Sequence, residues 1–554
     1  MQAGRAPVLD LAQIEILRRH GTEVPVTPGE VLFADGDESY DLIVLLEGQV
    51  EIVQDNGTPV ETSLATYGPS QFLGETGLLT GQRVFLTAVA RTPGRILRIS
   101  PAQLRQVMAQ ELDLSELILR AFLLRHSILT QIGSGLTLIG SRFGADTRRL
   151  LEVLARNRLP SKWLDLESSP DAERIIRQMG VPVDLLPIVI VPGRPFLRNP
   201  SSRTLLNALG LTGVTGYDGA EVCDLLVVGG GPAGLAAAVY GASEGMTTAL
   251  AEDTSLGGQA GTSSRIENYL GFPAGLSGEE LAARAALQAQ KFGVRIMLAS
   301  RAVSLRTKGD THRVAFESGE TITARAVIIA TGARYNRLPL ERLADFEGVG
   351  VFYAATQMEA MACGDGPAVI VGGGNSAGQA ALFLGATCTR VSIAIRGASL
   401  ASSMSRYLID QIERHPNIEV LPRTQVTALN GTEALESVDL LDSESDETRT
   451  AEVRGLFVFI GARPATAWLD GQLVADGKGF LLTGNDVPVA DGDERVPLFL
   501  ETSRPGIFCV GDVRSGSVKR CATAIGEGSM AVRLVFERLQ ATGSVAAGGT
   551  RIQT

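Results

Sequence analysis

Two glycine clusters are the segments whose residue types and spacing could do chemistry. In the first, Gly229-x-Gly231-x-x-Gly234 joins an apolar segment to an alanine-rich one, and Glu252 ends the next apolar segment. The first glycine permits a tight turn, the second lets the backbone approach a pyrophosphate, and the third allows close packing of helix on strand. An acidic side chain at the end of the second strand can bind ribose hydroxyls. The pattern predicts a dinucleotide site.

The second cluster repeats this order. Gly372-x-Gly374-x-x-Ala377 lies between the apolar segment PAVIV and an alanine-rich segment, and the strand VSIAI leads directly into Arg396. Because no Asp or Glu stands at the end of that strand and a guanidinium does, a dinucleotide with a 2′-phosphate is favoured over one with a free 2′-hydroxyl. The sequence therefore predicts two dinucleotide-binding folds in tandem.

The segments before these clusters indicate two further folding units. Short alternating strands with glycine and acidic turns, from Val26 to Ile99, predict a compact antiparallel barrel or sandwich. Apolar residues at three- and four-residue spacing then predict helices over 101–130, with Ser100 as N-cap before Pro101. A β-α-β-α-β order follows, which predicts a small mixed α/β domain with segments at 136–141, 145–157, 162–167, 170–179 and 187–191.

Length and composition limit the function classes. A chain of 554 residues holds about three to five domains at ordinary domain sizes. The net charge of −11, without a block of Lys or Arg, argues against nucleic acid or an anionic membrane as partner. No apolar run is long enough for a membrane span and the start does not resemble a signal peptide, so we expect a cytoplasmic protein. The five cysteines never form C-x-x-C, so neither a disulfide framework nor a metal site is indicated.

From about Cys223 to Leu539 the sequence resembles the low-molecular-weight thioredoxin reductases, a group of pyridine-nucleotide flavoproteins. The resemblance lies in six motifs that occur in the family's order. They are GGGPAG (229–234), LGGQAG (256–261), IENYLGFP (266–273), ATGA (330–333), GGGNSAGQ (372–379) and FCVGD (508–512).

The resemblance implies FAD in the first fold and NADPH in the second, with the second fold inserted into the first. Asp512 would hold the ribityl chain of FAD, since a carboxylate can accept hydrogen bonds from several hydroxyls. The FAD residues it implies are Gly229, Gly231, Pro232, Ala233, Gly234, Glu252, Gly258, Gln259, Asn268, Thr331, Gly332, Ala333, Gly511, Asp512, Arg520, Cys521 and Ala522. The NADPH residues are Gly372, Gly374, Asn375, Ser376, Ala377 and Arg396, with Arg406 as a second basic residue.

Two departures from the family change the expected chemistry. The family's Tyr-Cys-Ala-Thr-Cys stretch is here Tyr353-Ala354-Ala355-Thr356-Gln357, so both redox-active cysteines are replaced and dithiol chemistry at that place is excluded. The family's Arg-Gln-Ala stretch is here Arg520-Cys521-Ala522. We interpret Cys521 as a small packed side chain rather than a flavin adduct, and Cys363 as structural. Hydride transfer to a flavin needs no side-chain acid or nucleophile, so no catalytic residue is assigned.

The first two units resemble known domains as well. The middle segment resembles a thioredoxin or glutaredoxin fold, with GSRFGAD (140–146) where the C-x-x-C would stand. Residues 20–130 resemble a cyclic nucleotide-binding domain, in which Gly74 and Glu75 match the phosphate cassette. The family's phosphate-binding Arg is displaced, because Arg83 comes one residue early and Val84 and Phe85 follow, and in an extended segment this turns the side chain to the opposite face. Cyclic nucleotide binding and a structural domain without ligand both remain open.

The predicted fold is α/β, with two tandem Rossmann-like domains after a β-barrel/helix domain and a thioredoxin-like domain. The predicted function is an NADPH-dependent FAD oxidoreductase without the dithiol, passing electrons to a quinone, dioxygen, a protein or an external disulfide. Alternatives are a flavin or cyclic-nucleotide sensor and a thioredoxin reductase with non-standard cysteines; the resemblance also implies a homodimer. The predicted domains are 1–132 (cyclic nucleotide-binding-like), 133–212 (thioredoxin-like), 213–222 (linker), 223–337 and 462–554 (FAD) and 338–461 (NADPH).

Overall fold

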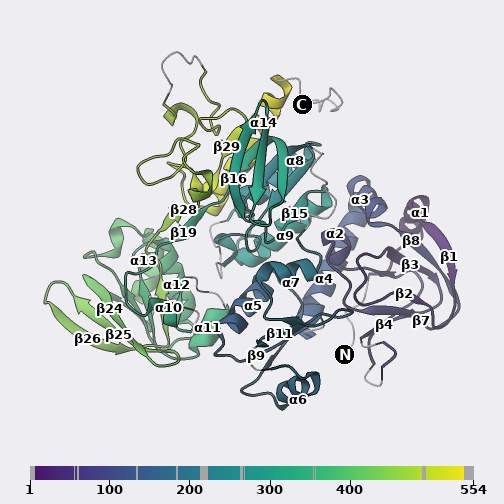
Figure 1. Ribbon diagram of the computed structural model, residues 1–554, viewed down its shortest axis with the longest axis horizontal. Helices are drawn as coiled ribbons and strands as arrows, with labels where there is room; N and C mark the ends of the chain where they lie inside the picture. Colours follow the sequence, from purple (N-terminus) through teal and green to yellow (C-terminus); the bar gives the residue numbers. More distant parts are fainter. Residues whose placement is uncertain are drawn as a thin grey trace.

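The computed structural model has four globular regions, each with one or two β-sheets of its own (Figure 1). In Figure 1 the N-terminal domain is purple, the middle domain dark blue, the first dinucleotide domain teal and yellow, and the second dinucleotide domain green. The residues described are 7–54, 56–58, 61–132, 135–182, 185–212, 222–262, 266, 269–347, 349–353, 355, 357–488 and 495–541.

The N-terminal domain consists of two four-stranded antiparallel sheets, in the orders β1-β8-β3-β6 and β2-β7-β4-β5. Among the described residues no strand of one sheet pairs with the other, so the expected barrel is not closed and the domain is a sandwich. The Ser100 hydroxyl caps the first of the expected helices, as predicted. The elements are α1 (Leu11–His20), β1 (Thr22–Val26), β2 (Val31–Phe33), β3 (Leu42–Glu47), β4 (Val50–Gln54), β5 (Thr62–Tyr67), β6 (Phe72–Leu73), α2 (Gly77–Thr80), β7 (Thr87–Ala90), β8 (Gly94–Ile99), α3 (Pro101–Gln110) and α4 (Leu112–Ile132).

The middle domain has a mixed four-stranded sheet in the order β10-β9-β11-β12. The predicted β-α-β-α-β order is present, with β10 parallel and β11 antiparallel to β9. A short hairpin strand and a last helix, which the sequence did not suggest, complete it. The elements are β9 (Leu136–Gly140), α5 (Ala145–Arg156), β10 (Ser161–Asp165), α6 (Pro170–Met179), β11 (Ile188–Ile190), β12 (Leu197–Arg198) and α7 (Ser202–Ala208).

The first dinucleotide domain is built on a seven-stranded sheet in the order β15-β14-β13-β18-β17-β16, with β29 on β18. Strands β13, β14, β15, β18 and β29 are parallel neighbours and are largely buried, because helices and loops cover both faces. The elements are β13 (Val222–Val228), α8 (Pro232–Ser243), β14 (Thr248–Ala251), η2 (Ala260–Thr262), α9 (Gly278–Lys291), β15 (Arg295–Met297), β16 (Ala302–Lys308), β17 (Thr311–Phe316), β18 (Thr321–Ile329), η4 (Ala467–Leu469), η5 (Gly484–Asp486), β29 (Ile507–Cys509), η6 (Gly511–Val513) and α14 (Cys521–Ala541).

The second dinucleotide domain is inserted into the first, and the short pair β19-β28 joins them. Its parallel sheet has the order β20-β27-β21-β22-β23, beside an antiparallel sheet β24-β25-β26. The elements are β19 (Ala333–Tyr335), α10 (Leu343–Phe346), β20 (Val351–Phe352), α11 (Gln357–Cys363), β21 (Ala368–Val371), α12 (Asn375–Gly385), β22 (Val391–Ala394), η3 (Leu400–Ser402), α13 (Arg406–Arg414), β23 (Ile418–Leu421), β24 (Thr424–Gly431), β25 (Leu435–Asp442), β26 (Glu447–Glu452), β27 (Gly455–Val458) and β28 (Ala462–Pro464).

Neither a membrane-spanning helix nor a metal cluster occurs among the described residues. Every helix in the ranges given above is too short or too polar to cross a bilayer. No cluster of three or more His, Cys, Asp or Glu side chains is arranged to hold a metal ion in the part of the chain that the structure describes.

Candidate functional site: two dinucleotide sites and an N-terminal cassette

The turn between β13 and α8 has the geometry that the first glycine cluster predicts. Gly229 has a φ of +110°, and a Cβ there would lie 2.3 Å from the Ala330 carbonyl oxygen. Gly231 is the N-cap of α8 and Pro232 its first residue. Since no side chain caps this helix end, its first amides are available to an anion. Ala233 and Gly234 are buried, where α8 packs against the sheet.

Glu252 lies directly after β14, as expected, and is buried. Its carboxylate accepts hydrogen bonds from the backbone N–H of Gly230 at 2.6 Å and of Thr254 at 2.9 Å. Burial raises the pKa of Glu252, and the hydrogen bonds from the two backbone amides oppose this shift. The carboxylate thus links the glycine turn to the loop after β14.

The middle motifs meet near this turn. Gly258 lies beside Gly231, because a Cβ on Gly231 would find Gly258 Cα at 4.0 Å as its nearest neighbour. The Gln259 side-chain amide donates to the carbonyl of Ala333, and the Thr331 hydroxyl donates to the Ala465 carbonyl at 2.9 Å. Gly332, between Thr331 and Ala333 in the chain, has a φ of +65°. Asn268 lies outside the described residues.

Asp512 lies in the turn η6, immediately after β29. Its carboxylate is half-buried, and burial raises the pKa of Asp512. The described residues donate no hydrogen bond to this carboxylate, so its acceptor sites are open to hydroxyl donors of a ligand.

An ion pair that the sequence did not suggest holds this turn. Glu527 of α14 accepts from the Gly511 backbone N–H at 2.7 Å and from Arg514 Nη2 at 2.6 Å. The Arg514 and Glu527 side chains are 12% and 9% exposed, so the pair is shielded from water. The two residues flanking Asp512 and Val513 are therefore fixed by one carboxylate.

The Arg520-Cys521-Ala522 stretch begins α14. Arg520 and Ala522 are exposed, and Cys521 is half-buried. Burial and the Asp512 charge raise the pKa of Cys521 to about 11. This thiol therefore stays protonated near neutral pH and is a weak nucleophile, in line with the interpretation of Cys521 as a packed side chain.

The residues of the first dinucleotide domain fit FAD. The glycine turn leaves backbone space beside uncapped helix amides for a pyrophosphate, Glu252 lies at the strand end where a ribose would bind, and Asp512 offers open acceptors to ribityl hydroxyls.

The second glycine turn has the same geometry. Gly372 has a φ of +141° and a Cβ there would lie 2.3 Å from the Phe459 carbonyl oxygen. Gly374 is the N-cap of α12. A Cβ on Gly374 would have open space around it, because its nearest neighbour among the described residues is the Ser403 carbonyl oxygen at 4.0 Å. Asn375 Nδ2 donates to the Ser405 hydroxyl at 2.8 Å, Ser376 is exposed and Ala377 is buried.

The two candidate phosphate-binding arginines differ in their surroundings. Arg396 follows β22, is exposed, and makes no hydrogen bond or ion pair with the described residues. Arg406 begins α13 and pairs with Asp410 at 2.6 Å on the same helix. Arg396 is thus free to bind an anion, whereas Arg406 is already paired.

A buried alanine lies between the two positions of the family's cysteines. Ala355 is buried, and Ala354 and Thr356 lie outside the described residues. All five cysteines are free thiols. Burial raises the pKa of Cys363 to about 12, and it also raises the pKa of Cys388 and of Cys509.

In the N-terminal domain the three predicted phosphate-cassette residues, Gly74, Glu75 and Arg83, do not converge on one point. The Glu75 carboxylate accepts from the Thr76 hydroxyl at 3.0 Å and lies 3.9 Å from His126 Nδ1. Arg83 instead donates to Glu38 at 2.6 Å and to the Gly36 carbonyl at 3.2 Å. Gly74 has a φ of +151° and accepts from Arg125 through its carbonyl oxygen at 2.6 Å.

The residues after Arg83 explain this direction. Val84, at the family's arginine position, is buried in the core of the N-terminal domain, while Phe85 is buried in the core of the middle domain. Val84 and Phe85 thus enter different cores, while the Arg83 guanidinium binds Glu38 and the Gly36 carbonyl.

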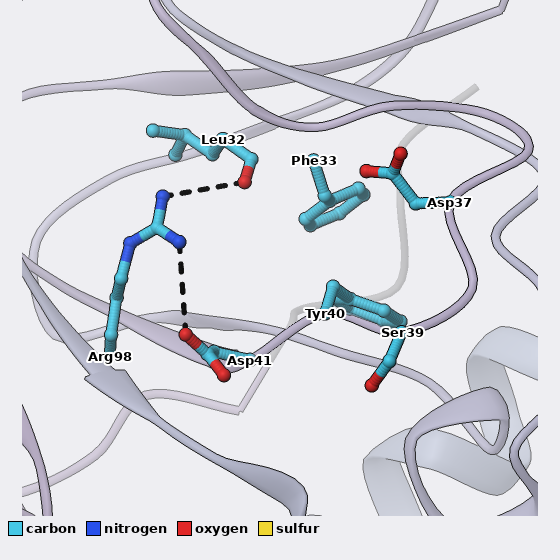
Figure 2. Close-up of a pocket in the computed structure, with 7 residues that line it drawn as sticks. All are labelled: Leu32, Phe33, Asp37, Ser39, Tyr40, Asp41 and Arg98. Atoms are coloured by element: carbon cyan, nitrogen blue, oxygen red, sulfur yellow. Dashed lines mark hydrogen bonds and ion pairs between the residues drawn. The ribbon is translucent and has the colours of Figure 1, made fainter.

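The N-terminal domain has a pocket elsewhere, of about 380 Å³ (Figure 2). Arg98 crosses one side of it, donating to the Leu32 carbonyl at 3.4 Å and facing Asp41 at 3.7 Å. Phe33, Tyr40, Asp37 and Ser39 complete the lining, and none of the three predicted cassette residues belongs to it.

Sequence reasoning missed three sets of contacts: the Glu527–Arg514 pair, the insertion of Arg125 under the cassette, and the contacts of His126. Each is a tertiary contact between different elements, 13 residues apart for Glu527 and Arg514 and more than 30 apart for Arg125 and His126, and each uses a common residue type. A polar residue at a buried helix position was the one available signal.

Comparison with known proteins gives two matching families. The profile of the pyridine nucleotide-disulphide oxidoreductases matches residues 223–528, and that of cyclic nucleotide-binding domains matches residues 23–111. The chain is 30% identical over 322 residues to a thioredoxin reductase of Mycoplasmopsis pulmonis, a match that covers 58% of this chain and 98% of the relative. It is 31% identical over 318 residues to a thioredoxin reductase of Chlamydia trachomatis, covering 55% of this chain and 95% of that relative.

A solved structure agrees with this match. The thioredoxin reductase of Lactococcus lactis superposes with a TM-score of 0.52 at 26% identity, over 58% of this chain and 99% of that one. The first profile covers more than half of the chain, and the fold and both glycine turns agree with it. The chain therefore belongs to the pyridine nucleotide-disulphide oxidoreductase family, as a flavin oxidoreductase whose cofactors are FAD and a nicotinamide nucleotide, and it carries a cyclic nucleotide-binding domain in its N-terminal part.

Proposed function

We propose that this chain oxidises NADPH and passes the electrons from FAD directly to an acceptor outside the chain, without an internal dithiol. The observation that carries the proposal is the replacement of both family cysteines in Tyr353-Ala354-Ala355-Thr356-Gln357. Neither alanine nor an amide can form a mixed disulfide. A quinone, dioxygen, a redox protein and an external disulfide are the candidate acceptors.

The protein's own contribution is binding and orientation. When bound, FAD supplies the hydride and electron transfer chemistry. The uncapped amides at Gly231 and the carboxylates of Glu252 and Asp512 would hold it, and the amides at Gly374 would hold the nicotinamide nucleotide. Arg396 supports NADPH over NADH, since an exposed guanidinium without a partner among the described residues suits a 2′-phosphate.

Anaerobic reductive titration of the purified chain tests the absence of a dithiol. We expect two electrons per polypeptide, which FAD alone accepts. Uptake of four electrons would mean a hidden disulfide and would overturn the proposal. Cys363 and Cys388, which are buried in the same apolar core, are then the pair to examine, and Cys363→Ser would return the uptake to two.

A flavin-based sensor is the second candidate, because the N-terminal domain is bonded to the middle domain and the middle domain to the first dinucleotide domain. NADPH consumption with an added acceptor, well above slow oxidase leakage, favours the enzyme. Reduction without turnover, together with a change in partner binding, favours the sensor. A homodimer and a cytoplasmic location stay predictions.

A further inference from the structure

A chain of contacts connects the N-terminal cassette with Glu252. Phe85, which follows the cassette, is buried in the core of the middle domain together with Leu205 and Leu209 of the α7 region. Leu298 of the first dinucleotide domain belongs to the same core. One apolar cluster thus includes side chains from three domains.

Backbone hydrogen bonds run through the same place. The Arg83 N–H donates to the Leu209 carbonyl at 3.2 Å, and the Leu298 N–H donates to the Leu211 carbonyl at 3.2 Å. Residues 209–211, which we call the bridge, are therefore bonded to the cassette on one side and to the first dinucleotide domain on the other. The close approach of Gly210 to the Gly81 carbonyl adds a third contact.

Residues 297–300, which the bridge contacts through Leu298, are hydrogen-bonded to the backbone of Glu252. The Glu252 N–H donates to the Met297 carbonyl at 2.9 Å, and its carbonyl accepts from the Ser300 N–H at 2.8 Å. Ala299, between them, has a φ of +50°, which is unfavourable for a residue with a Cβ. Arg203 of α7 donates to the Ala299 carbonyl at 3.4 Å, so the middle domain also contacts this strained residue.

A second set of contacts reaches the loop after Glu252. His126 Nε2 lies 3.0 Å from the Arg158 carbonyl oxygen and its Nδ1 lies 3.0 Å from the Thr76 hydroxyl. A carbonyl oxygen only accepts, so Nε2 is the donor in the contact with Arg158. In the same turn, Asn157 Nδ2 donates to the Thr254 carbonyl at 3.3 Å.

We propose that the N-terminal domain is a positioning element for the adenosine end of the FAD site, acting through the bridge on Glu252 and on the loop that Thr254 begins. The inference rests on FAD binding at the first glycine turn. When a binding loop already has its ligand-bound conformation, no free energy is spent on ordering it during binding, so the ligand binds more tightly. Phe85, Asn157 and residues 209–211 are therefore positioning residues, although none of them belongs to the predicted FAD site.

The test is the rate of FAD dissociation from the full-length holoprotein, measured by flavin fluorescence after dilution. Phe85→Ala is expected to raise this rate at least about fivefold. Phe85→Leu is expected to keep the rate close to that of the unmodified protein. The control is Phe33→Ala, since Phe33 is buried to a similar degree in the N-terminal domain but packs within that domain's own core. It is expected to leave the rate within about twofold.

Two further readouts separate positioning from general destabilisation. The absorbance spectrum of the bound flavin and the NADPH dissociation constant should not change in Phe85→Ala, because neither the ring end nor the second domain is touched. If Phe85→Ala does not fold, Asn157→Ala replaces it, with Asn417→Ala as control. Asn417 Nδ2 donates to a carbonyl at the same 3.3 Å in the second dinucleotide domain.

Unchanged FAD dissociation in both variants, Phe85→Ala and Asn157→Ala, or equal acceleration in the controls, would overturn the proposal. The dissociation rate does not depend on the electron acceptor or on a dithiol. A four-electron titration would therefore refute the proposed function and leave this measurement intact, so the two proposals fail separately.

Discussion

Replacing Glu527 tests how the turn around Asp512 is held. Glu527 is the partner both of Arg514 and of the Gly511 N–H, in a setting where the two side chains are 9% and 12% exposed. Arg514 Nε is already buried without a hydrogen-bond partner in the described structure. Removing the carboxylate leaves a buried guanidinium without its counter-charge, so we expect Glu527→Ala to lower the free energy of unfolding of the apoprotein by about 3 to 5 kcal/mol.

Glu527→Gln separates the charge from the hydrogen bonds. The amide oxygen can still accept from the Gly511 N–H, but the ion pair with Arg514 is lost, so we expect a cost of about 2 kcal/mol. Because the turn carries Asp512, FAD should also bind more weakly. Urea denaturation of the apoprotein measures the first effect, and equilibrium titration with FAD measures the second.

The matched control for this experiment is on the same helix. Glu537 pairs with Arg533 at 3.0 Å in α14, with side chains 46% and 71% exposed, and an exposed pair contributes about 0.5 kcal/mol. Glu537→Gln should therefore change neither stability nor FAD affinity appreciably. If Glu527→Gln were as stable as Glu537→Gln and bound FAD equally well, the assigned role of this ion pair would be wrong.

Three further predictions concern other parts of the chain. Burial lowers the pKa of His312 to about 4; the charges of Arg538 and Arg504 add to this shift, and those of Asp310 and Glu501 oppose it. Between about pH 6.5 and 4 the unfolded state therefore binds more protons than the folded state. The free energy of unfolding should fall by about 2 kcal/mol from pH 7 to pH 5, and much less in His312→Gln. Arg396→Ala should weaken NADPH by about tenfold or more and NADH by less than about twofold, since only NADPH carries a 2′-phosphate, and equal losses would remove Arg396 as its partner. Calorimetry with cyclic AMP should give weak or no binding, because Arg83 is paired with Glu38; micromolar affinity that Glu75→Ala abolishes would contradict this.

The parts of the structure that the sequence predicted well are set by local chemistry. Gly229 and Gly372 occupy positive-φ positions where a Cβ would collide with a backbone carbonyl, so residue type and position are tied together. Ser100 caps a helix because its hydroxyl accepts a backbone N–H three residues ahead. Such features depend on a few neighbouring residues and can therefore be identified without coordinates.

The parts that could not be predicted depend on tertiary contacts between different elements. Nothing in the type of Glu527, Asn157 or His126 tells which backbone group each will meet. The choice between a barrel and a sandwich could not be made for the same reason, since alternation identifies strands but not whether the first sheet pairs with the second; the structure shows a sandwich. The position of Asp512 was predicted from its motif, whereas the ion pair that holds its turn was not.

The N-terminal cassette and the dithiol position depart from their families in one physical way. In both places described apolar residues are buried, with Val84 in one core, Phe85 in another and Ala355 between the two positions of the family's cysteines. A core is held by shape and burial, and one reactive side chain adds little to it. The fold therefore persists where the chemistry differs, and the function of each domain has to be argued from the side chains present. If the N-terminal domain acts through the contacts of Phe85, FAD dissociation changes in Phe85→Ala, whereas a nucleotide held by Arg83 is tested separately by the calorimetry with cyclic AMP.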